Sequence, residues 1–319
     1  MVNLKIEFFM PNNRRSFIKK TILATGSLAL PTILIAKNKK EDSKNKLSIL
    51  HTNDFHSRLE PFPMDGSPSE GLGGIATRAA IISQIRNEEE NILLLDAGDI
   101  FQGTPYFNFF KGEPEIKAMS MMGYDAATIG NHDFDGGIDN LALQINKANF
   151  PFINCNYNFS NTSMKNKTIP YKIFDKGNIR IGVLGVGIEL QGLVPENLSG
   201  KTQYIEPLII ANETASKLRK DGCDLVVCLS HLGDRYLDAT ISDETLAKQS
   251  FDIDLIIGGH THKLFYQPRK YTNKTKSDVL VNQVGWAGMH LGRLDYLFQG
   301  KKRKNMTKAH TVIISKKTN

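Results

Sequence analysis

Short runs of apolar residues recur along the chain after residue 46, and most of them are followed by Gly, Asn, Asp or His. Continuous apolar runs of about four to eight residues, bounded by turn residues, are typical of strands buried on both faces of a sheet. The pattern predicts strands at Leu47–Leu50, Ile92–Leu95, Ala126–Ile129, Ile179–Val186, Leu225–Leu229, Leu255–Ile257, Val279–Val284 and Leu291–Phe298.

Apolar positions with helical spacing lie between several of these runs. They predict helices at Ile75–Arg86, Glu115–Met122, Asp139–Ala148 and Pro207–Lys220. Alternating strands and helices favour a layered α/β fold with parallel strand pairs. The last three predicted strands follow one another with little helical sequence between them, so we expect antiparallel pairing there.

The domain organisation follows from the same pattern. No long linker divides residues 47–299, so we expect one domain in this segment. Residues 300–319 are expected to form a basic tail that ends in a short strand at Thr311–Ile314.

Charge is distributed unevenly along the chain. The 319 residues include 40 Lys and Arg against 33 Asp and Glu, a formal net charge of +7. Residues 1–46 carry ten basic and three acidic residues and residues 300–319 carry seven basic ones, which leaves 23 basic and 30 acidic residues in 47–299. An acidic domain without a stripe of Lys and Arg among aromatic residues does not fit a nucleic-acid-binding protein. We therefore expect no nucleic-acid partner.

The first 46 residues are expected to be a signal peptide and linker. Arg14 and Arg15 precede an uncharged, mostly apolar segment at Thr21–Ala36, which is the layout of an export signal. The paired arginines resemble the bacterial twin-arginine signal, which implies a periplasmic or extracellular location. Leu34 is not a small residue at the position three before a cut after Ala36. An uncleaved signal that anchors the chain is therefore the alternative, and the only membrane contact that we expect.

Five of the predicted strands run into segments that contain metal-binding residue types. These segments are His51–His56, Asp96–Asp99, Gly130–Asp135, Ser230–His231 and Gly258–His262. In open α/β sheets, functional groups collect beyond the carboxyl ends of strands. Glycines in Gly130–Asp135 and Gly258–His262 allow the backbone to turn tightly beside a ligand or metal. We therefore expect the five segments to meet at one site.

The order and spacing of these segments resemble the calcineurin-like metallophosphoesterases. Within that family, the stretches HTNDFH, DAGDIFQGTPYFNFFKG, GNHDFD and GGHTH are similar to the catalytic domain of secreted 5′-nucleotidases and UDP-sugar hydrolases. The resemblance extends from about Leu47 to Phe298. It implies a four-layer αββα sandwich and an enzyme that hydrolyses phosphoesters at a two-metal centre, with a hydroxide between the metals as the nucleophile.

The resemblance also implies a ligand set in which one carboxylate bridges two ions. The first ion would take Asp54, His56, Asp99 and His262, and the second would take Asp99, Asn131, His231 and His260. Carboxylate, imidazole and amide ligands without a thiolate suit divalent transition-metal ions such as Mn, Zn, Fe or Co. Two such ions are therefore the expected cofactors.

A catalytic histidine is implied next to this ligand set. His132 matches the family's catalytic position, with Asp135 as its carboxylate partner and Asp133 as the alternative. A cationic imidazole oriented by a carboxylate can stabilise a transition state and protonate a leaving alkoxide. Asn131 and His132 are also the residues that we expect to contact the substrate.

The expected substrate is a small phosphoester, with nucleoside 5′-monophosphates favoured. Full-length relatives carry a C-terminal domain whose aromatic residues clamp the nucleobase, and residues 47–299 show no evident clamp motif. The substrate is therefore a different phosphoester, or a separate polypeptide supplies the nucleotide-binding domain; we favour the second. A 2′,3′-cyclic-nucleotide phosphodiesterase, a thiosulfohydrolase of the same superfamily and a catalytically dead exported binding module are the alternative functions.

Overall fold

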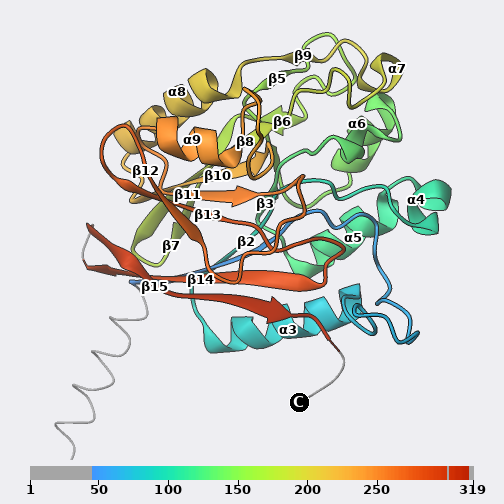
Figure 1. Ribbon diagram of the computed structural model, residues 1–319, viewed down its shortest axis with the longest axis horizontal. Coiled ribbons are helices and arrows are strands. Elements are labelled where there is room, and N and C mark those ends of the chain that lie inside the picture. Colours follow the sequence, from blue (N-terminus) through green and yellow to red (C-terminus); the bar gives the residue numbers. More distant parts are fainter. Residues whose placement is uncertain (1–44, 300–301, 316–319) are drawn as a thin grey trace, which may run out of the picture. The chain divides into compact units, whose positions relative to one another are not determined.

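The computed structural model describes residues 45–299 and 302–315 (Figure 1). The export signal predicted at 14–36 lies outside these residues. A compact unit runs from Ser43 to Asn319. Within the described ranges, no helix is both long and apolar enough to cross a membrane.

A seven-stranded sheet combines the first strands of the unit with its last two. Its order is β15-β14-β1-β2-β3-β4-β6. Within this order, β1, β2, β3, β4 and β6 pair in parallel, each with the next. β14 is antiparallel to both β1 and β15. The strands are β1 (Lys46–Thr52), β2 (Ile92–Asp96), β3 (Ala126–Ala127), β4 (Phe152–Ile153), β6 (Thr168–Ile169), β14 (His290–Gln299) and β15 (Lys302–Ile313).

A six-stranded sheet is formed by the middle of the chain. Its order is β12-β13-β11-β10-β8-β7, with parallel pairs at the centre and antiparallel strands at both edges. The strands are β7 (Tyr171–Lys176), β8 (Ile179–Gly187), β10 (Leu225–His231), β11 (Leu255–Gly258), β12 (Arg269–Thr272) and β13 (Asp278–Asn282). A separate two-stranded sheet pairs β5 (Tyr157–Asn158) with β9 (Gln203–Tyr204).

Helices cover the outer faces of the two large sheets (Figure 1). Three helices share an apolar cluster with the seven-stranded sheet, namely α3 (Ile75–Glu88), α5 (Glu113–Met122) and α6 (Ile138–Ile145). The six-stranded sheet packs on α8 (Pro207–Lys220) and α9 (Asp243–Gln249). The short α4 (Pro105–Phe110), α7 (Glu196–Ser199) and the 3₁₀ helix at His132–Phe134 lie in connections between strands.

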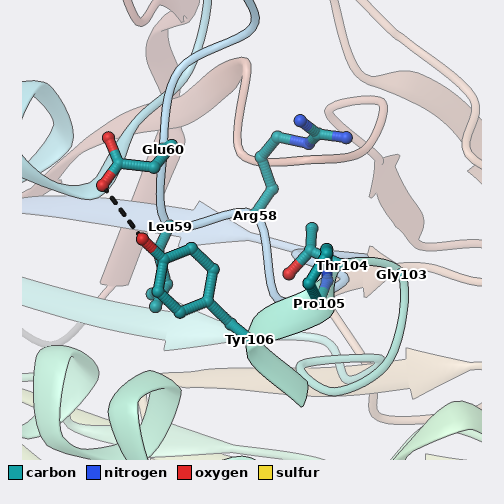
Figure 2. A pocket seen from close by; sticks show the side chains of 7 residues that line it. All are labelled: Arg58, Leu59, Glu60, Gly103, Thr104, Pro105 and Tyr106. Carbon is teal, nitrogen blue, oxygen red and sulfur yellow. Dashed lines mark hydrogen bonds between the residues drawn. The ribbon is translucent and has the colours of Figure 1, made fainter. Parts of the chain in front are cut away.

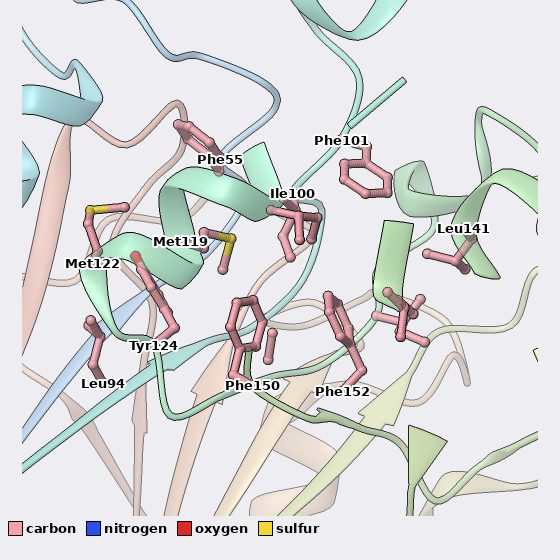
Figure 3. Close-up of a cluster of buried hydrophobic side chains, with 14 of the residues drawn as sticks. Phe55, Leu94, Ile100, Phe101, Met119, Met122, Tyr124, Leu141, Phe150 and Phe152 are labelled. Atoms are coloured by element: carbon pink, nitrogen blue, oxygen red, sulfur yellow. The ribbon is translucent and has the colours of Figure 1, made fainter. Parts of the chain in front are cut away.

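Alternating residues of the central strands point into different layers. On β2, Leu93 and Leu95 join the cluster between the two sheets, whereas Leu94 joins the cluster beneath the helices. Figure 3 shows part of that helix-facing cluster, with Met119 and Met122 on α5. Both faces of β2 are therefore buried, as its unbroken apolar run predicts. The predicted four-layer αββα sandwich is confirmed.

The pairing expected at the end of the chain is partly wrong. β13 is parallel to β11, and β14 lies in the other sheet beside β1. The antiparallel neighbour of β13 is β12, which has no apolar run because its residues are only partly buried or exposed. The last strand also begins at Lys302 rather than Thr311. Backbone hydrogen bonds to β14 hold this basic segment, so hydrophobic patterning did not reveal it.

Candidate metal centre

The carboxyl ends of four parallel strands bring the predicted segments together. β1 ends at Thr52, β2 at Asp96, β10 at His231 and β11 at Gly258. The loops that follow belong to both sheets, and hydrogen bonds join them directly. The backbone N–H of His260 donates to Oδ1 of Asp54 at 2.9 Å, across 206 positions of sequence.

Five of the predicted ligands in these loops have a left-handed backbone conformation, which residues with a side chain rarely adopt. Asp54, His56, Asp99, His260 and His262 all have φ between 51° and 70°. Such a left-handed conformation costs roughly 1–3 kcal/mol per non-glycine residue and persists only where surrounding contacts enforce it. The concentration of this strain in the predicted ligand loops indicates that their geometry serves a function.

The first cluster of metal-binding groups contains Asp54, His56 and His262. The Nε2 atoms of His56 and His262 face each other at 3.0 Å. Oδ1 of Asp54 lies 3.3 Å from Nε2 of His262 and 4.0 Å from Nε2 of His56. Asp54 is fully buried, and the side chain of His262 is 38% exposed. One carboxylate oxygen and two ring nitrogens therefore converge at the edge of the site.

The second cluster contains Asp99, His231 and His260. Nε2 of His231 lies 2.9 Å from Oδ2 of Asp99. Asn131 joins the cluster because its Oδ1 lies 2.8 Å from Nδ1 of His260. All seven predicted ligands are thus brought to one place.

Asp99 lies between the two clusters. Its Oδ1 accepts a hydrogen bond from the backbone N–H of His132 at 2.8 Å, which fixes the carboxylate. Its Oδ2 lies 2.9 Å from Nε2 of His231 and 3.9 Å from Nε2 of His56. The same oxygen therefore faces groups of both clusters, which is the placement that a bridging ligand needs.

The ring nitrogens of these clusters fit metal ligation. Nδ1 of His231 lies 2.6 Å from the carbonyl oxygen of Ala97, and the opposite ring nitrogen, Nε2, is buried and faces the Asp99 carboxylate. This is the arrangement typical of a metal-binding histidine. Burial lowers the pKa of His260 to about 4, so its ring is neutral at pH 7. Burial also lowers the pKa of His231, but the Asp99 and Asp54 carboxylates outweigh it and raise the value to about 10. A divalent ion would displace that proton on binding.

His132 lies beside the clusters. Its ring centroid is 5.3 Å from that of His56, and its Nδ1 is 2.8 Å from Oδ2 of Asp135. The hydrogen bond to Asp135 raises the pKa of His132 above its ordinary value. The side chain is 40% exposed, so a proton carried by this imidazole is accessible to a bound substrate.

Asp133, the alternative partner of His132, contacts backbone instead. Its carboxylate accepts hydrogen bonds from the N–H groups of Gly130, Asp99, Ile100 and Phe101 at 2.8–3.2 Å. Asp133 therefore ties the loop after β2 to the loop after β3 and places Asp99.

The remaining acid and histidine of the predicted segments lie behind the site. His51 is fully buried, and its Nε2 lies 2.9 Å from Nδ2 of Asn282. Burial lowers the pKa of His51 to about 3 and raises that of Asp96 to about 7. Asp96 accepts hydrogen bonds from Thr52 and from the backbone of Gly98. Both side chains support the loops from within.

Sequence reasoning missed two residues that contact the ligand loops. Gln283 donates from Nε2 to the carbonyl of Gly259 at 2.6 Å and so holds the loop that carries His260. Trp286 stacks on the ring of His262 with an interplanar angle of 2°. Neither lies in a recognisable motif, although Trp286 is the chain's single tryptophan, a signal that could have drawn attention to it.

A small pocket of about 190 Å³ opens next to the loop of His56 (Figure 2). Its lining includes Arg58, Gly103 and Tyr106. A Cβ on Gly103 would lie 2.9 Å from Cβ of His56, so the backbone here packs directly against the first cluster. Figure 2 shows Tyr106 turned toward Glu60, 3.3 Å from its carboxylate, and Arg58 extending away from this pair.

Comparisons with known proteins agree with the resemblance noted in the sequence. Residues 47–264 match the family model described as calcineurin-like phosphoesterase. The chain is 32% identical over 291 residues to snake venom 5′-nucleotidase of Gloydius brevicauda, covering 85% of this chain and 48% of that protein. It is 32% identical over 316 residues to the 5′-nucleotidase of Vibrio parahaemolyticus, covering 90% and 55%.

A solved structure agrees as well. The 5′-nucleotidase precursor from Thermus thermophilus superposes with a TM-score of 0.74 at 30% identity, covering 85% of this chain and 55% of that one. The chain thus spans about half the length of the relatives that it matches.

Proposed function

The chain belongs to the calcineurin-like phosphoesterase family, and on that premise we propose that it is a hydrolase that cleaves phosphoesters with two divalent metal ions. The observation that carries the proposal is the position of Asp99. Its Oδ2 faces ring nitrogens of both ligand clusters while its Oδ1 is held by the backbone of His132. A carboxylate shared in this way suits a pair of ions better than a single one.

The proposed ligands are divided between the two clusters. Asp54, His56 and His262 would hold one ion, Asn131, His231 and His260 the other, and Asp99 both. When bound, two such ions activate a water for attack on phosphorus and neutralise charge on the phosphoryl oxygens. Mn, Zn, Fe and Co all suit this donor set.

His132 is proposed to carry out the proton transfer. The hydrogen bond to Asp135 orients its ring and raises its pKa, which favours the cationic form. A cationic imidazole can contact the phosphoryl oxygens and donate its proton to the leaving alkoxide. Asn131, next in sequence, is proposed to contact the same phosphoryl group through its side-chain amide.

Nucleoside 5′-monophosphates are the proposed substrates. Relatives named 5′-nucleotidase support this choice. A separate polypeptide with a nucleotide-binding domain is proposed as a partner, because residues 47–299 show no evident aromatic motif that would clamp a nucleobase. Co-purification that finds no partner, together with full nucleotidase activity of the isolated chain, would reject that partner.

Export is proposed from the sequence alone. Arg14 and Arg15 ahead of the apolar segment at 21–36 suit the twin-arginine route, which leads to the periplasm or the cell exterior, with an uncleaved signal as a membrane anchor. Replacing both arginines with lysine should retain the protein in the cytoplasm, measured by cell fractionation. Unchanged export of that variant would reject the route.

A substrate panel with defined metals tests the activity. The chelator-treated chain should hydrolyse AMP only after Mn²⁺ or Zn²⁺ is restored, and more efficiently than UDP-glucose, a cyclic nucleotide, an aryl phosphate or a thiosulfonate. Hydrolysis of the cyclic nucleotide or thiosulfonate in preference to AMP would reject the nucleotidase assignment. Full activity in the presence of excess chelator would reject metal catalysis.

Replacing the shared carboxylate tests the two-ion arrangement. Asp99→Ala removes the oxygen that faces both clusters and should abolish binding of both ions, measured as metal-to-protein stoichiometry after gel filtration. Asp295→Ala is a matched control, because this buried aspartate lies on β14 and bonds Ser48 instead. Two ions retained in Asp99→Ala would contradict the arrangement.

A further inference from the structure

The proposed histidine ligands differ in how their rings are held. Nδ1 of His231 lies 2.6 Å from a backbone carbonyl, and the ring of His231 is fully buried. His262 has a 38% exposed side chain, and its Nε2 faces His56 and Asp54. Within the described part of the chain, Nδ1 of His262 has no hydrogen-bond partner. A metal-binding histidine is usually oriented through that second nitrogen; the contact that the described residues offer to His262 is a ring stack.

Trp286 supplies a contact of the right geometry. Its ring is parallel to that of His262, with an interplanar angle of 2° and centroids 5.6 Å apart. It also meets the ring of His56 edge-on, with centroids 6.5 Å apart. Parallel offset rings attract each other, and a flat stack fixes the plane of the smaller ring.

The backbone on both sides of Trp286 is tied to the ligand loops. The N–H of Gly285 donates to the carbonyl of Lys263, next to His262, at 2.8 Å. The N–H of Ala287 donates to the carbonyl of Asp54 at 2.7 Å. The indole is therefore positioned relative to the same backbone segments that carry the first cluster.

We infer that Trp286 is a positioning residue for the first metal site, where stacking on His262 does what the hydrogen bond from Nδ1 to the Ala97 carbonyl does for His231. This role rests on the proposed two-metal function, and it assigns a task to a residue outside the ligand set. Loss of a group that orients a ligand typically weakens metal binding by about 10–100-fold. Binding of the ion held by His262 should therefore weaken, whereas binding of the ion held by His231 and His260 should not change.

The wild-type protein offers a direct readout. Because the chain has one tryptophan, its indole emission reports this position alone. Mn²⁺ added to the chelator-treated full chain should quench the emission in a saturable way. His262→Ala should move that quenching to higher Mn²⁺ concentration. An identical quenching curve in His262→Ala would overturn the inference.

Variants of Trp286 test the role itself by calorimetric titration with Mn²⁺. Trp286→Leu keeps apolar volume but removes the ring. It should lower the affinity for one of the two ions by about 10–100-fold and leave the affinity for the other unchanged. Trp286→Phe keeps a flat ring and should restore most of the affinity. Phe62→Leu is the matched control, since Phe62 contacts Trp286 with centroids 6.1 Å apart, and it should bind both ions as the wild type does.

The outcomes separate this inference from the proposed function. Wild-type protein that takes up none of Mn²⁺, Zn²⁺, Fe²⁺ and Co²⁺ would reject the two-metal function itself. Wild-type protein that binds two ions, with Trp286→Leu binding both as tightly, would reject only the role of Trp286. If Trp286→Leu lowers the affinity for both ions equally and Trp286→Phe does not restore it, the loss reflects general structural damage. That result would likewise overturn the inference.

Discussion

At the residue scale, two neighbouring aspartates illustrate how one residue type serves different tasks. Asp133 accepts backbone hydrogen bonds from four residues on two loops. Asp135 lies beside the ring of His132. A carboxylate with several N–H donors around it is a fixed support, whereas one beside an exposed imidazole can change that ring's protonation. We therefore expect replacements of Asp133 to act on folding and replacements of Asp135 to act on turnover.

Replacing His132 should reduce turnover without removing metal. His132→Ala deletes a positioned acid and should lower kcat for AMP by about 10²–10⁴-fold, with metal stoichiometry unchanged. The loss should be smaller for an aryl phosphate, whose leaving group needs less protonation. His310→Ala, outside every motif, serves as the control. Turnover of His132→Ala equal to that of the wild type would exclude the assigned role.

Asp96 should make stability depend on pH. Burial raises its pKa to about 7 from an ordinary value of 3.8, so the folded state favours the protonated carboxyl. The resulting stabilisation is fully present below the unfolded pKa and is lost as pH rises to about 7, by about 1.4 kcal/mol for each unit of pKa difference.

The Asp96→Asn variant should lose less stability than the wild type between pH 4 and pH 7. Urea unfolding of the chelator-treated chain measures this free-energy difference, with exposed Asp175→Asn as the control. Parallel pH profiles for wild type and Asp96→Asn would contradict the prediction.

At the scale of elements, β8 and β4 approach each other so closely that only glycine fits at position 185 of β8. A Cβ on Gly185 would lie 2.0 Å from the carbonyl oxygen of Ile153. The N–H of Cys155 donates to the carbonyl of Gly185 at 2.8 Å. The two large sheets thus meet backbone to backbone here, which leaves no room for a side chain.

Two glycines of β8 should respond differently to substitution. Gly185→Ala meets rigid backbone and should lower the free energy of unfolding by about 1–3 kcal/mol or more. Gly182→Ala meets the flexible end of Leu218 at 2.9 Å and should cost less, because that side chain can move. Thermal and urea unfolding compare the two variants. Equal losses would argue against the backbone contact.

At the scale of the whole molecule, the last described residues, 302–315, belong to the folded domain. β15 pairs with β14 along the edge of the seven-stranded sheet. Beyond it, the N–H of Ile314 donates to the carbonyl of Met289 at 2.8 Å, and the carbonyl of Ile314 accepts from Gly73 at 2.8 Å. The expected basic tail is therefore a structural strand that connects the sheet to the loop before α3.

Adjacent isoleucines at the end of the chain allow a matched test. Ile314 is fully buried, and Ile313 is 55% exposed. Ile314→Ala should lower the free energy of unfolding by about 2–5 kcal/mol, and Ile313→Ala by no more than about 1 kcal/mol. Equal, small effects in urea unfolding would show that the end of the chain does not contribute to the core.

Much of the fold and of the candidate site could be predicted from the sequence. Strands buried on both faces leave unbroken apolar runs, so β1, β2, β8, β10 and β11 could be located. The family and the four-layer sandwich are confirmed. β12, by contrast, is an edge strand of partly exposed residues and leaves no such run. The roles of the individual ligands and of His132 stay predictions.

The sequence by itself determined the buried strands, the residue types that follow them and hence the chemistry of the site, because these depend on positions a few residues apart. Only the tertiary structure decided that Asp135 rather than Asp133 lies beside His132, that β13 is parallel to β11, and that Trp286 stacks on His262. Asp135 is only three positions from His132, but Asp133 is taken up by the loop after β2, which is distant in sequence. The other contacts join distant segments directly, as the bond between His260 and Asp54 does across 206 positions. They depend on how the two sheets pack together, which no local pattern encodes.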